Sequence, residues 1–132
     1  MGDDESLRAA KTFIDTSIDS VVQLEILLLL YREPEREWST LEVAQRLRVD
    51  RAWIVDELAH LCARCLLIHR PGDVPVYRFA AGNPDLRREV QNLAQIYADR
   101  RVTIVTLIAS KPVDKIRVFT DAFKLRQEGE DG

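Results

Sequence analysis

Two histidines and two cysteines lie close together near the middle of the chain, in a pattern that could bind a metal. The pattern is His60-x-Cys62-x-x-Cys65-x-x-x-His69, and all four side chains are potential zinc ligands. On a helix, Cys62 and Cys65 would share a face, so that two thiolates could point together. His69, however, falls in a segment with the composition of a strand, and cysteine is ordinarily a core residue. We therefore expect half-buried structural cysteines, no metal and no cofactor; metal binding or thiol sensing is the alternative.

Enzymatic chemistry finds little support in the rest of the sequence. There is no glycine-rich phosphate loop and no Ser-His-Asp set in a recognisable context. Neighbouring carboxylates such as Asp56 and Glu57 would fall on different faces of a helix. Two histidines and one CxxC supply too few groups for acid–base catalysis. We expect that the protein is not an enzyme.

Composition indicates one ordinary globular domain. The 132 residues are 46% apolar and 31% charged, with a formal net charge of −3. The longest unbroken apolar run, residues 26–31, is about a third of what a bilayer-spanning helix needs. The N-terminus lacks the basic and apolar regions of a signal peptide, and two cysteines are too few for a disulfide scaffold. We expect a cytoplasmic protein without membrane contact, on which any nucleic-acid surface must come from a local arrangement of charge.

Helix-start signals recur along the first half of the chain. Apolar positions at helical spacing predict a short helix from Leu7 to about Thr16, preceded by frayed residues 1–6. Ser20 with Gln23 forms a capping box that opens the next helix, which is apolar on most of its circumference and therefore central. The sequence Glu33-Pro34 ends it.

Two further helices and a hairpin follow. Ser39 and Glu42 form a second capping box, flanked by the hydrophobic staple Trp38/Val43, and Asp50 can cap a third helix that ends near residues 64–65. Residues 66–70 and 76–80 have strand composition, and residues 71–75 hold the turn-forming types. The fold class that this order predicts is mainly α with a small β-hairpin.

The C-terminal third is predicted to be helical. Asn83 can cap a helix with Pro84 in its first position. Residues 102–108 are β-branched and could form a strand, but we favour a helix that continues to about Ala109. Pro112 then begins a last helix. The apolar side of that last helix comprises Val113, Ile116, Phe119 and Phe123.

The segment 39–70 resembles the helix-turn-helix and first wing strand of bacterial winged helix-turn-helix transcription regulators, broadly of the MarR, ArsR and PadR kind. The matching pattern is Ser39-Thr40-Leu41, then Leu47, then Val49-Asp50 followed by apolar residues at 54, 58 and 61. Residues 66–70, Leu-Leu-Ile-His-Arg, resemble the Gly-Leu-Ile-x-Arg segment that follows the recognition helix in such proteins, and Cys65 stands where relatives usually place a helix-ending glycine. The resemblance covers about 30 residues closely and about 60 by element order. It implies a winged helix-turn-helix with additional N- and C-terminal helices.

By this resemblance, the chain would bind double-stranded DNA, with the helix at about 50–64 in the major groove. Base-reading positions would be 51–53, 55 and 56, while Arg48 and the start of the preceding helix would hold phosphates. The implied DNA-binding residues are Ser39, Thr40, Arg48, Arg51, Ala52, Trp53, Arg70 and Arg78. Val55, Asp56 and the wing residue Asp73 depart from the family habit, because they are apolar or acidic. The alternative is a degenerate winged helix that binds protein through Trp53, or through Phe119 and Phe123.

Apolar residues at heptad-like spacing also suggest self-association. This stripe either covers the chain's own winged domain or pairs with its copy, as C-terminal helices do in dimeric relatives; we favour a homodimer. The stripe comprises Leu86, Val90, Leu93, Tyr97 and Ile104. The expected organisation is an N-terminal tail and short helix at 1–19, the winged domain at 20–82 and a helical, dimerising extension at 83–132.

Overall fold

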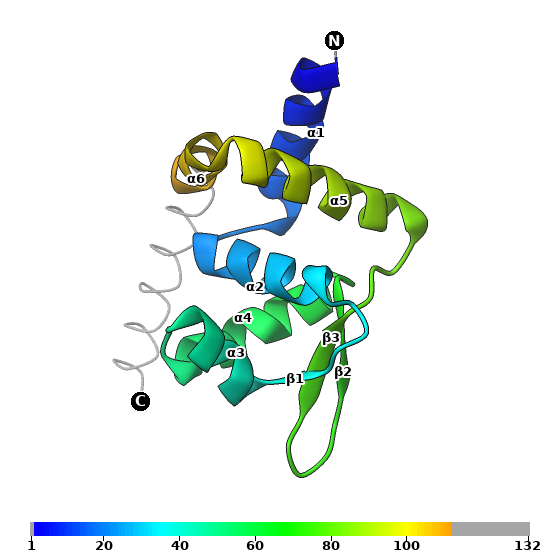
Figure 1. Cartoon of the computed structure of the whole chain (residues 1–132), viewed down its shortest axis with the longest axis vertical. Coiled ribbons are helices and arrows are strands. Elements are labelled where there is room, and N and C mark those ends of the chain that lie inside the picture. Colours follow the sequence, from blue (N-terminus) through cyan, green and yellow to red (C-terminus); the bar gives the residue numbers. More distant parts are fainter. Residues whose placement is uncertain (1, 112–132) are drawn as a thin grey trace, which may run out of the picture.

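The computed structural model describes residues 2–111, which form six helices and three strands (Figure 1). The fold is mainly α with a small antiparallel sheet, as the sequence predicts. In chain order the elements are α1 (Gly2–Ser17), α2 (Val21–Arg32), β1 (Trp38–Ser39), α3 (Thr40–Leu47), α4 (Arg51–Ala63), β2 (Leu67–Arg70), β3 (Val76–Phe79), α5 (Pro84–Asp99) and α6 (Arg101–Ala109). No helix in this described part is long and apolar enough to cross a lipid bilayer.

The predicted helix starts are confirmed. The Ser20 hydroxyl accepts the Gln23 N–H at 3.1 Å, the Asp50 carboxylate accepts the Ala52 N–H at 2.9 Å, and the Asn83 side chain accepts the Leu86 N–H at 2.9 Å. One detail differs: the Gln23 side chain accepts the N–H of Asp19 rather than that of Ser20. For residues 2–6 the expected fraying was wrong, since α1 begins at Gly2. Asn92 of α5 donates to the Ser6 carbonyl at 2.9 Å and helps to hold this turn in place.

The sheet has three strands in the order β1-β3-β2, all antiparallel. β2 and β3 form the expected hairpin, with Leu67 opposite Phe79 and Arg70 opposite Val76. β1 was not expected from the sequence. It is only two residues long, and it pairs Trp38 with Tyr77 and thereby attaches the start of α3 to the base of the wing.

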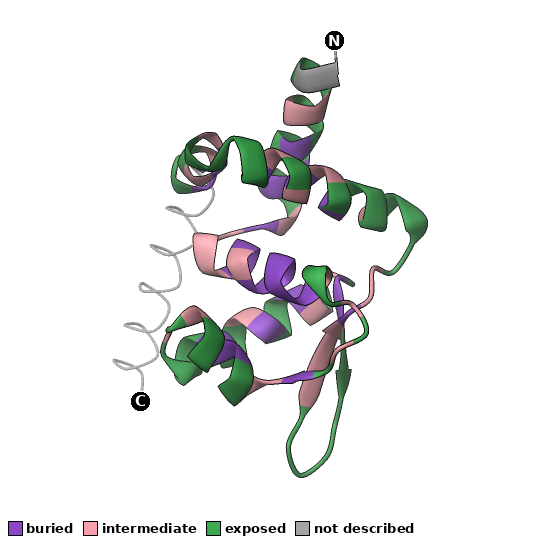
Figure 2. Cartoon of the chain, in the orientation of Figure 1, coloured by how far each residue is buried: buried purple, intermediate pink, exposed green. Residues whose placement is uncertain are grey.

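The central helix of the fold is α2. It packs against α3, α4 and β3 on one side and against α5 and α6 on the other (Figure 1). Six of its side chains, Leu24 and Ile26–Leu30, are apolar and buried, which explains why its apolar residues cover most of its circumference (Figure 2). The core is continuous from α1 to α6.

The segment 102–108 is helical, as we favoured, but it belongs to a separate helix. The Arg100 backbone, at φ −134° and ψ 57°, breaks the path between α5 and α6. The helix expected from Pro112, with Phe119 and Phe123, lies outside the described residues.

Candidate nucleic-acid interface

Among residues 2–111, the outer side of α4 is exposed, as a recognition helix requires. Ile54, Leu58 and Leu61 are fully buried beneath the helix, whereas Arg51 and Ala52 in its first turn are exposed. Val55 and Asp56 are also exposed, and they give this surface one apolar and one acidic group. Of the residues expected to read bases, only Arg51 therefore offers a positive charge.

The turn before α4 adds a second arginine. Arg48 ends α3 in the left-handed conformation, at φ 58°, which turns the chain sharply enough for α4 to cross α3. The side chains of Arg48 and Arg51 make no hydrogen bond or ion pair with any residue from 2 to 111, and both are exposed. Both guanidinium groups can therefore bind an anion without first breaking an internal contact.

Trp53 does not lie among the base-reading positions as simply as the sequence suggests. It is 64% exposed, but it lines a surface hollow together with Ser20 and Val22 at the start of α2 and with Asp56 and Glu57 of α4. Its indole therefore lies on the flank of α4 that faces α2. On helical geometry, Ala52 and Asp56 occupy the side opposite the buried face.

The start of α3 is engaged in internal contacts. The Ser39 hydroxyl accepts the Glu42 N–H at 3.1 Å, and the Glu42 carboxylate accepts the Ser39 N–H at 2.9 Å, which confirms the capping box. These hydrogen bonds, chiefly the one from the Ser39 backbone, lower the pKa of Glu42. Thr40 is half-buried. A carboxylate thus occupies the first turn of α3, where the resemblance implied a phosphate.

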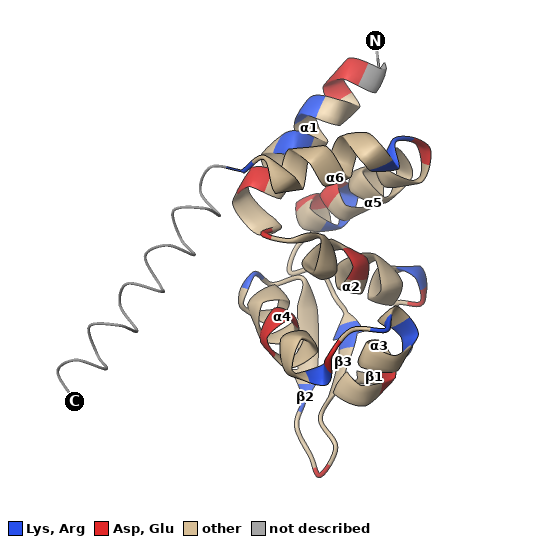
Figure 3. Ribbon diagram, turned by 90° about the vertical axis from the view of Figure 1, so that its left-hand side faces the viewer, with Lys and Arg blue, Asp and Glu red and all other residues tan. Residues whose placement is uncertain are grey.

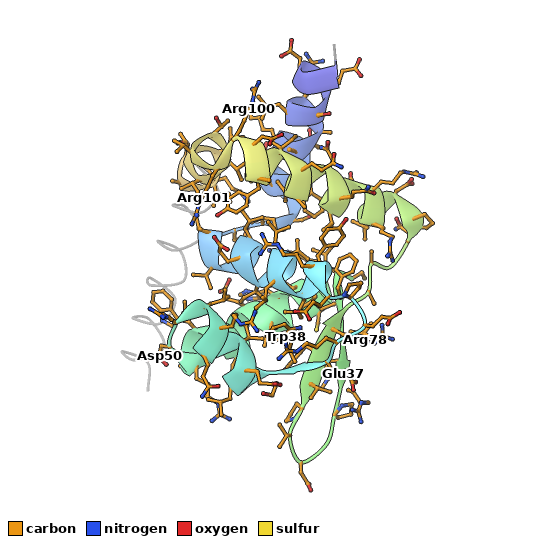
Figure 4. All side chains as sticks on the ribbon, in the orientation of Figure 1. Glu37, Trp38, Asp50, Arg78, Arg100 and Arg101 are labelled. Carbon is orange, nitrogen blue, oxygen red and sulfur yellow. The ribbon has the colours of Figure 1, made fainter. Side chains whose placement is uncertain are left out.

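The wing contributes fewer free charges than the sequence suggests. The Arg70 guanidinium donates two hydrogen bonds to the Glu37 carboxylate, from Nε and from Nη2, each at 2.7 Å. The hydrogen bond from Arg70 holds the pKa of Glu37 below its ordinary value, and the nearby Arg78 lowers it further. Arg78 is half-buried in β3 and makes no ion pair within the described chain. Figure 4 shows Glu37 and Arg78 near the base of the wing. Sequence reasoning missed this ion pair, because Glu37 and Arg70 are 33 positions apart.

Acidic groups are interspersed with the basic ones over this whole face. Asp50 caps α4, Asp56 lies on its outer side, and Asp73 lies at the tip of the wing, where Figure 3 shows a red segment. Within the described residues, the basic side chains on this face that make no ion pair are those of Arg48, Arg51 and Arg78.

A second feature that sequence reasoning missed is a stack of arginines over Trp38. The Arg36 guanidinium lies 3.6 Å from the centre of the Trp38 ring, and that of Arg46 lies 5.2 Å from it. Arg36 also forms an ion pair with Glu42 at 3.3 Å. These two cations thus fix β1 to α3, and the Trp38/Val43 staple is buried beneath them.

The four potential zinc ligands are not brought together. His60 lies within hydrogen-bond distance of the Gln23 amide, and His69 packs against the Tyr77 ring at 5.0 Å. Cys62 is half-buried, and burial raises the pKa of its thiol. Cys65 is exposed at φ 63°, the left-handed conformation that a helix-ending glycine adopts readily. Within residues 2–111, no group of three or more His, Cys, Asp or Glu side chains is placed to bind a metal.

The stripe expected at a dimer interface lies inside the chain. Val90, Leu93 and Ile104 are fully buried and Tyr97 is 6% exposed, while Leu86 is half-buried. α5 packs along α1, and the Tyr97 hydroxyl donates to Glu25 of α2 at 2.6 Å. In this conformation the buried side chains cannot meet a second copy. The spacing predicted a helix-pairing face, and the structure supplies α1 and α2 as its partners.

Comparison with solved structures identifies the architecture. A mutant of MepR from Staphylococcus aureus bound to an oligodeoxyribonucleotide matches with a TM-score of 0.54 at 12% identity, over 96% of this chain and 91% of that chain. PefR from Streptococcus agalactiae, a heme sensor protein in complex with heme, matches with a TM-score of 0.54 at 13% identity, over 92% and 81%. The transcriptional regulator Tm0710 from Thermotoga maritima matches with a TM-score of 0.51 at 13% identity, over 96% and 88%.

Sequence comparisons add nothing to this picture: no protein-family model matches the chain, and no curated protein does. At 12–13% identity, the structural matches establish the fold and leave the function open. The match extends over nearly the whole chain, including the helices outside the winged core. The chain therefore has the winged helix-turn-helix fold of bacterial MarR-type transcription regulators.

Proposed function

We propose that this protein is a DNA-binding transcription regulator that places α4 in the major groove of double-stranded DNA. The observation that carries the proposal is the exposed outer side of α4, flanked by the guanidinium groups of Arg48 and Arg51, which have no partner among residues 2–111. The fold shared with a regulator bound to an oligodeoxyribonucleotide supports it. In this arrangement Ala52 and Val55 are small enough to approach thymine methyl groups, while Arg51 can bind a guanine or a phosphate.

We further propose that the protein acts as a homodimer through the helical extension. The stripe of α5 is buried within the chain, whereas the outer side of α6 is exposed and uncharged. Val102 is 79% exposed, and Val105, Thr106 and Ala109 follow it at helical spacing. After Arg101, α6 carries no charged residue, which is unusual for a helix that faces water. A two-fold pair would place two copies of α4 on two half-sites and double the number of phosphate contacts.

Titration with duplex DNA at several salt concentrations tests the proposal. If Arg48, Arg51 and Arg78 each neutralise one phosphate, a dimer makes six such contacts, and the slope of log K against log salt is about −5. Affinity then falls by about 10³-fold between 50 and 200 mM salt. Arg51→Ala should make the slope less steep by about 2, since it removes one contact per protomer. The matched control is Arg8→Ala, which removes the same charge from the exposed side of α1, far from the wing.

The second candidate is a winged helix that binds protein instead of DNA. Three large apolar side chains of the helix-turn-helix are exposed: Leu41 at 49%, Trp53 at 64% and Val55 at 45%. Carboxylates at 50 and 56 repel phosphates on the same surface. Phosphate contacts are strongest at low salt, about 20 mM. If the protein fails to bind DNA even there, protein binding is favoured over DNA binding.

A further inference from the structure

A surface hollow with three arginines in its wall lies beside β1 and α3. Its volume is about 420 Å³, which falls within the range of small-molecule sites, about 300–1,000 Å³. It is lined by Arg36, Trp38, Glu42, Gln45, Arg46 and Arg48. Three guanidinium groups and one carboxylate give this lining a formal charge of +2, on a chain whose net charge is −3. Such a local concentration of positive charge favours an anionic ligand.

The arginine side chains are arranged so that their N–H groups can be shared with a ligand. The Arg36 and Arg46 guanidinium groups lie 3.6 Å and 5.2 Å from the centre of the Trp38 ring. Neither Arg46 nor Arg48 makes a hydrogen bond or ion pair with another residue from 2 to 111. A guanidinium that stacks on a ring keeps the N–H groups of its edge available, and such an edge binds two oxygens of one phosphate.

The wall of the hollow also contains an indole N–H without a partner. Trp38 is 1% exposed, and its Nε1 is buried and makes no hydrogen bond within the described part of the chain. A buried N–H without an acceptor is unfavourable, and most such groups in folded proteins are therefore paired. Because Trp38, which Figure 4 labels, lines the hollow, an anion bound there can supply the acceptor oxygen.

Nearby carboxylates restrict which anions suit the hollow. Glu42 accepts the Ser39 N–H at 2.9 Å and an Arg36 N–H at 3.3 Å, so both of its oxygens have donors. Glu33 lies 3.8 Å from the same guanidinium. Since these carboxylates weaken the positive potential, a ligand with a single negative charge is held less well than a dianion. A phosphomonoester, with a charge of about −1.5 to −2 at neutral pH, meets this requirement better than a phosphodiester.

We propose that this hollow binds a phosphomonoester, that is, a small molecule that carries a dianionic phosphate group. Arg36, Arg46 and Arg48 bind the phosphate oxygens, and the Trp38 indole N–H donates to one of them. The rest of the volume holds the organic part of the ligand. Arg48 also belongs to the proposed DNA interface, so the bound ligand withdraws this side chain from the DNA backbone and acts as an inducer. Ligand binding does not depend on the proposed function, whereas its effect on DNA rests on it.

The NMR signal of the Trp38 indole N–H tests the binding directly. The chain has two tryptophans, so in the Trp53→Phe variant the remaining indole signal belongs to Trp38. Titration with methyl phosphate at about pH 8, where the phosphate is a dianion, should move this signal downfield along a saturable curve. Dimethyl phosphate carries one charge less and should bind about fivefold more weakly, because one fewer charge interacts with the guanidinium groups.

Substitutions in the same background locate the site. Arg48→Gln should weaken methyl phosphate binding about tenfold, because it removes a charge-assisted hydrogen bond of an exposed side chain. Arg48→Lys keeps the charge but loses the planar fork, and its affinity should lie between the two. Glu42→Gln should tighten binding, because it removes the carboxylate from the lining while glutamine can still cap α3. The matched control is Arg8→Gln, which removes a charge from the exposed side of α1 and should leave the affinity unchanged.

Each result decides the matter. A shift that does not saturate, or that sodium chloride of the same ionic strength reproduces, overturns the site. Equal affinities of Arg48→Gln and Arg8→Gln also overturn it, and so does weaker binding by Glu42→Gln. If duplex DNA moves the Trp38 signal and methyl phosphate does not, the hollow contacts the DNA backbone, and the small-molecule ligand is overturned.

The effect on DNA is measured separately. Withdrawal of Arg48 removes two phosphate contacts in a dimer, so saturating methyl phosphate should make the slope of log K against log salt less steep by about 1.8. It should leave the slope of the Arg48→Gln variant unchanged. Methyl phosphate binding without DNA binding by any variant would refute the proposed function and leave the site intact. An unchanged slope at a saturated Trp38 signal would refute the inducer role alone.

Discussion

Replacing Glu37 by glutamine should convert Arg70 from an internal ion-pair partner into a phosphate ligand. In the wild-type protein, two hydrogen bonds of 2.7 Å hold the Arg70 guanidinium against the Glu37 carboxylate at the base of the wing. Glutamine keeps the size of the side chain but removes the charge and one acceptor oxygen. Arg70, whose side chain is 69% exposed, is then free to reach the DNA backbone.

The magnitude follows from counterion release. One additional phosphate contact per protomer adds two contacts in a dimer, which makes the slope of log K against log salt steeper by about 1.8. Over the fourfold range from 50 to 200 mM salt, the affinity gain of the Glu37→Gln variant should therefore be about twelve times larger at the low end than at the high end. Fluorescence anisotropy of a labelled duplex across this salt series measures both quantities.

Two controls separate the contact from a mere change of net charge. Glu35→Gln makes the same charge change two residues away, at an exposed side chain with no ion pair among the described residues. Arg70→Ala should change the slope little in the wild-type background and should abolish the gain in the Glu37→Gln background. Equal slopes for Glu37→Gln and Glu35→Gln would show that Arg70 is not released onto DNA, and the reasoning would fail.

Three further predictions concern stability and assembly. Cys65→Gly relieves the left-handed backbone at φ 63° and should raise the free energy of unfolding by about 1 kcal/mol, or Tm by about 3 °C, in thermal melts; Cys65→Ala, which keeps a Cβ, should give no gain. Val102→Glu should lower the sedimentation coefficient from that of a dimer to that of a monomer. Val74→Glu, at an exposed valine in the wing loop, should leave it unchanged. A dimer that survives the Val102→Glu change would exclude the α6 interface. Hydrogen bonding lowers the pKa of Glu42 below its ordinary value of 4.5. The ionised carboxylate therefore stabilises the folded state at pH values above this ordinary pKa, and the contribution is lost as the pH falls through the lowered pKa. The stability difference between the wild-type chain and Glu42→Gln, followed by urea denaturation, should accordingly shrink as the solution is acidified; a difference that grows toward low pH would contradict the capping role.

The sequence predicted those parts of the fold that local chemistry determines. Ser20, Ser39, Asp50 and Asn83 each begin a helix because a short polar side chain satisfies backbone N–H groups that the helix leaves unpaired. These helix starts depend on residues within about four positions of each other, so a single sequence is enough to reveal them. The left-handed conformation of Cys65 was not predicted; the resemblance only placed Cys65 where relatives usually have a helix-ending glycine.

Features that depend on distant partners could not be predicted in this way. β1 consists of two residues without strand periodicity, and it exists because Tyr77, 39 positions later, pairs with Trp38. The stripe that includes Val90 and Leu93 had the right helical spacing, but spacing does not say whether the partner is another protomer or α1 of the same chain. The engagement of Arg70 by Glu37 was equally hidden, and it removes one of the eight residues expected at the DNA interface from immediate use.

The position of α2 has a consequence for any attempt to isolate the winged part. Residues 20–82 contain every element that faces the proposed DNA, so they look like a self-sufficient fragment. Yet α5 and α6 pack on the side of α2 that faces away from α3 and α4. A chain that ended at Gly82 would therefore expose leucine and isoleucine side chains of α2 to water. The helical extension thus covers one side of the hydrophobic core that it shares with the winged part. A fragment without the extension should be recovered as insoluble or aggregated material.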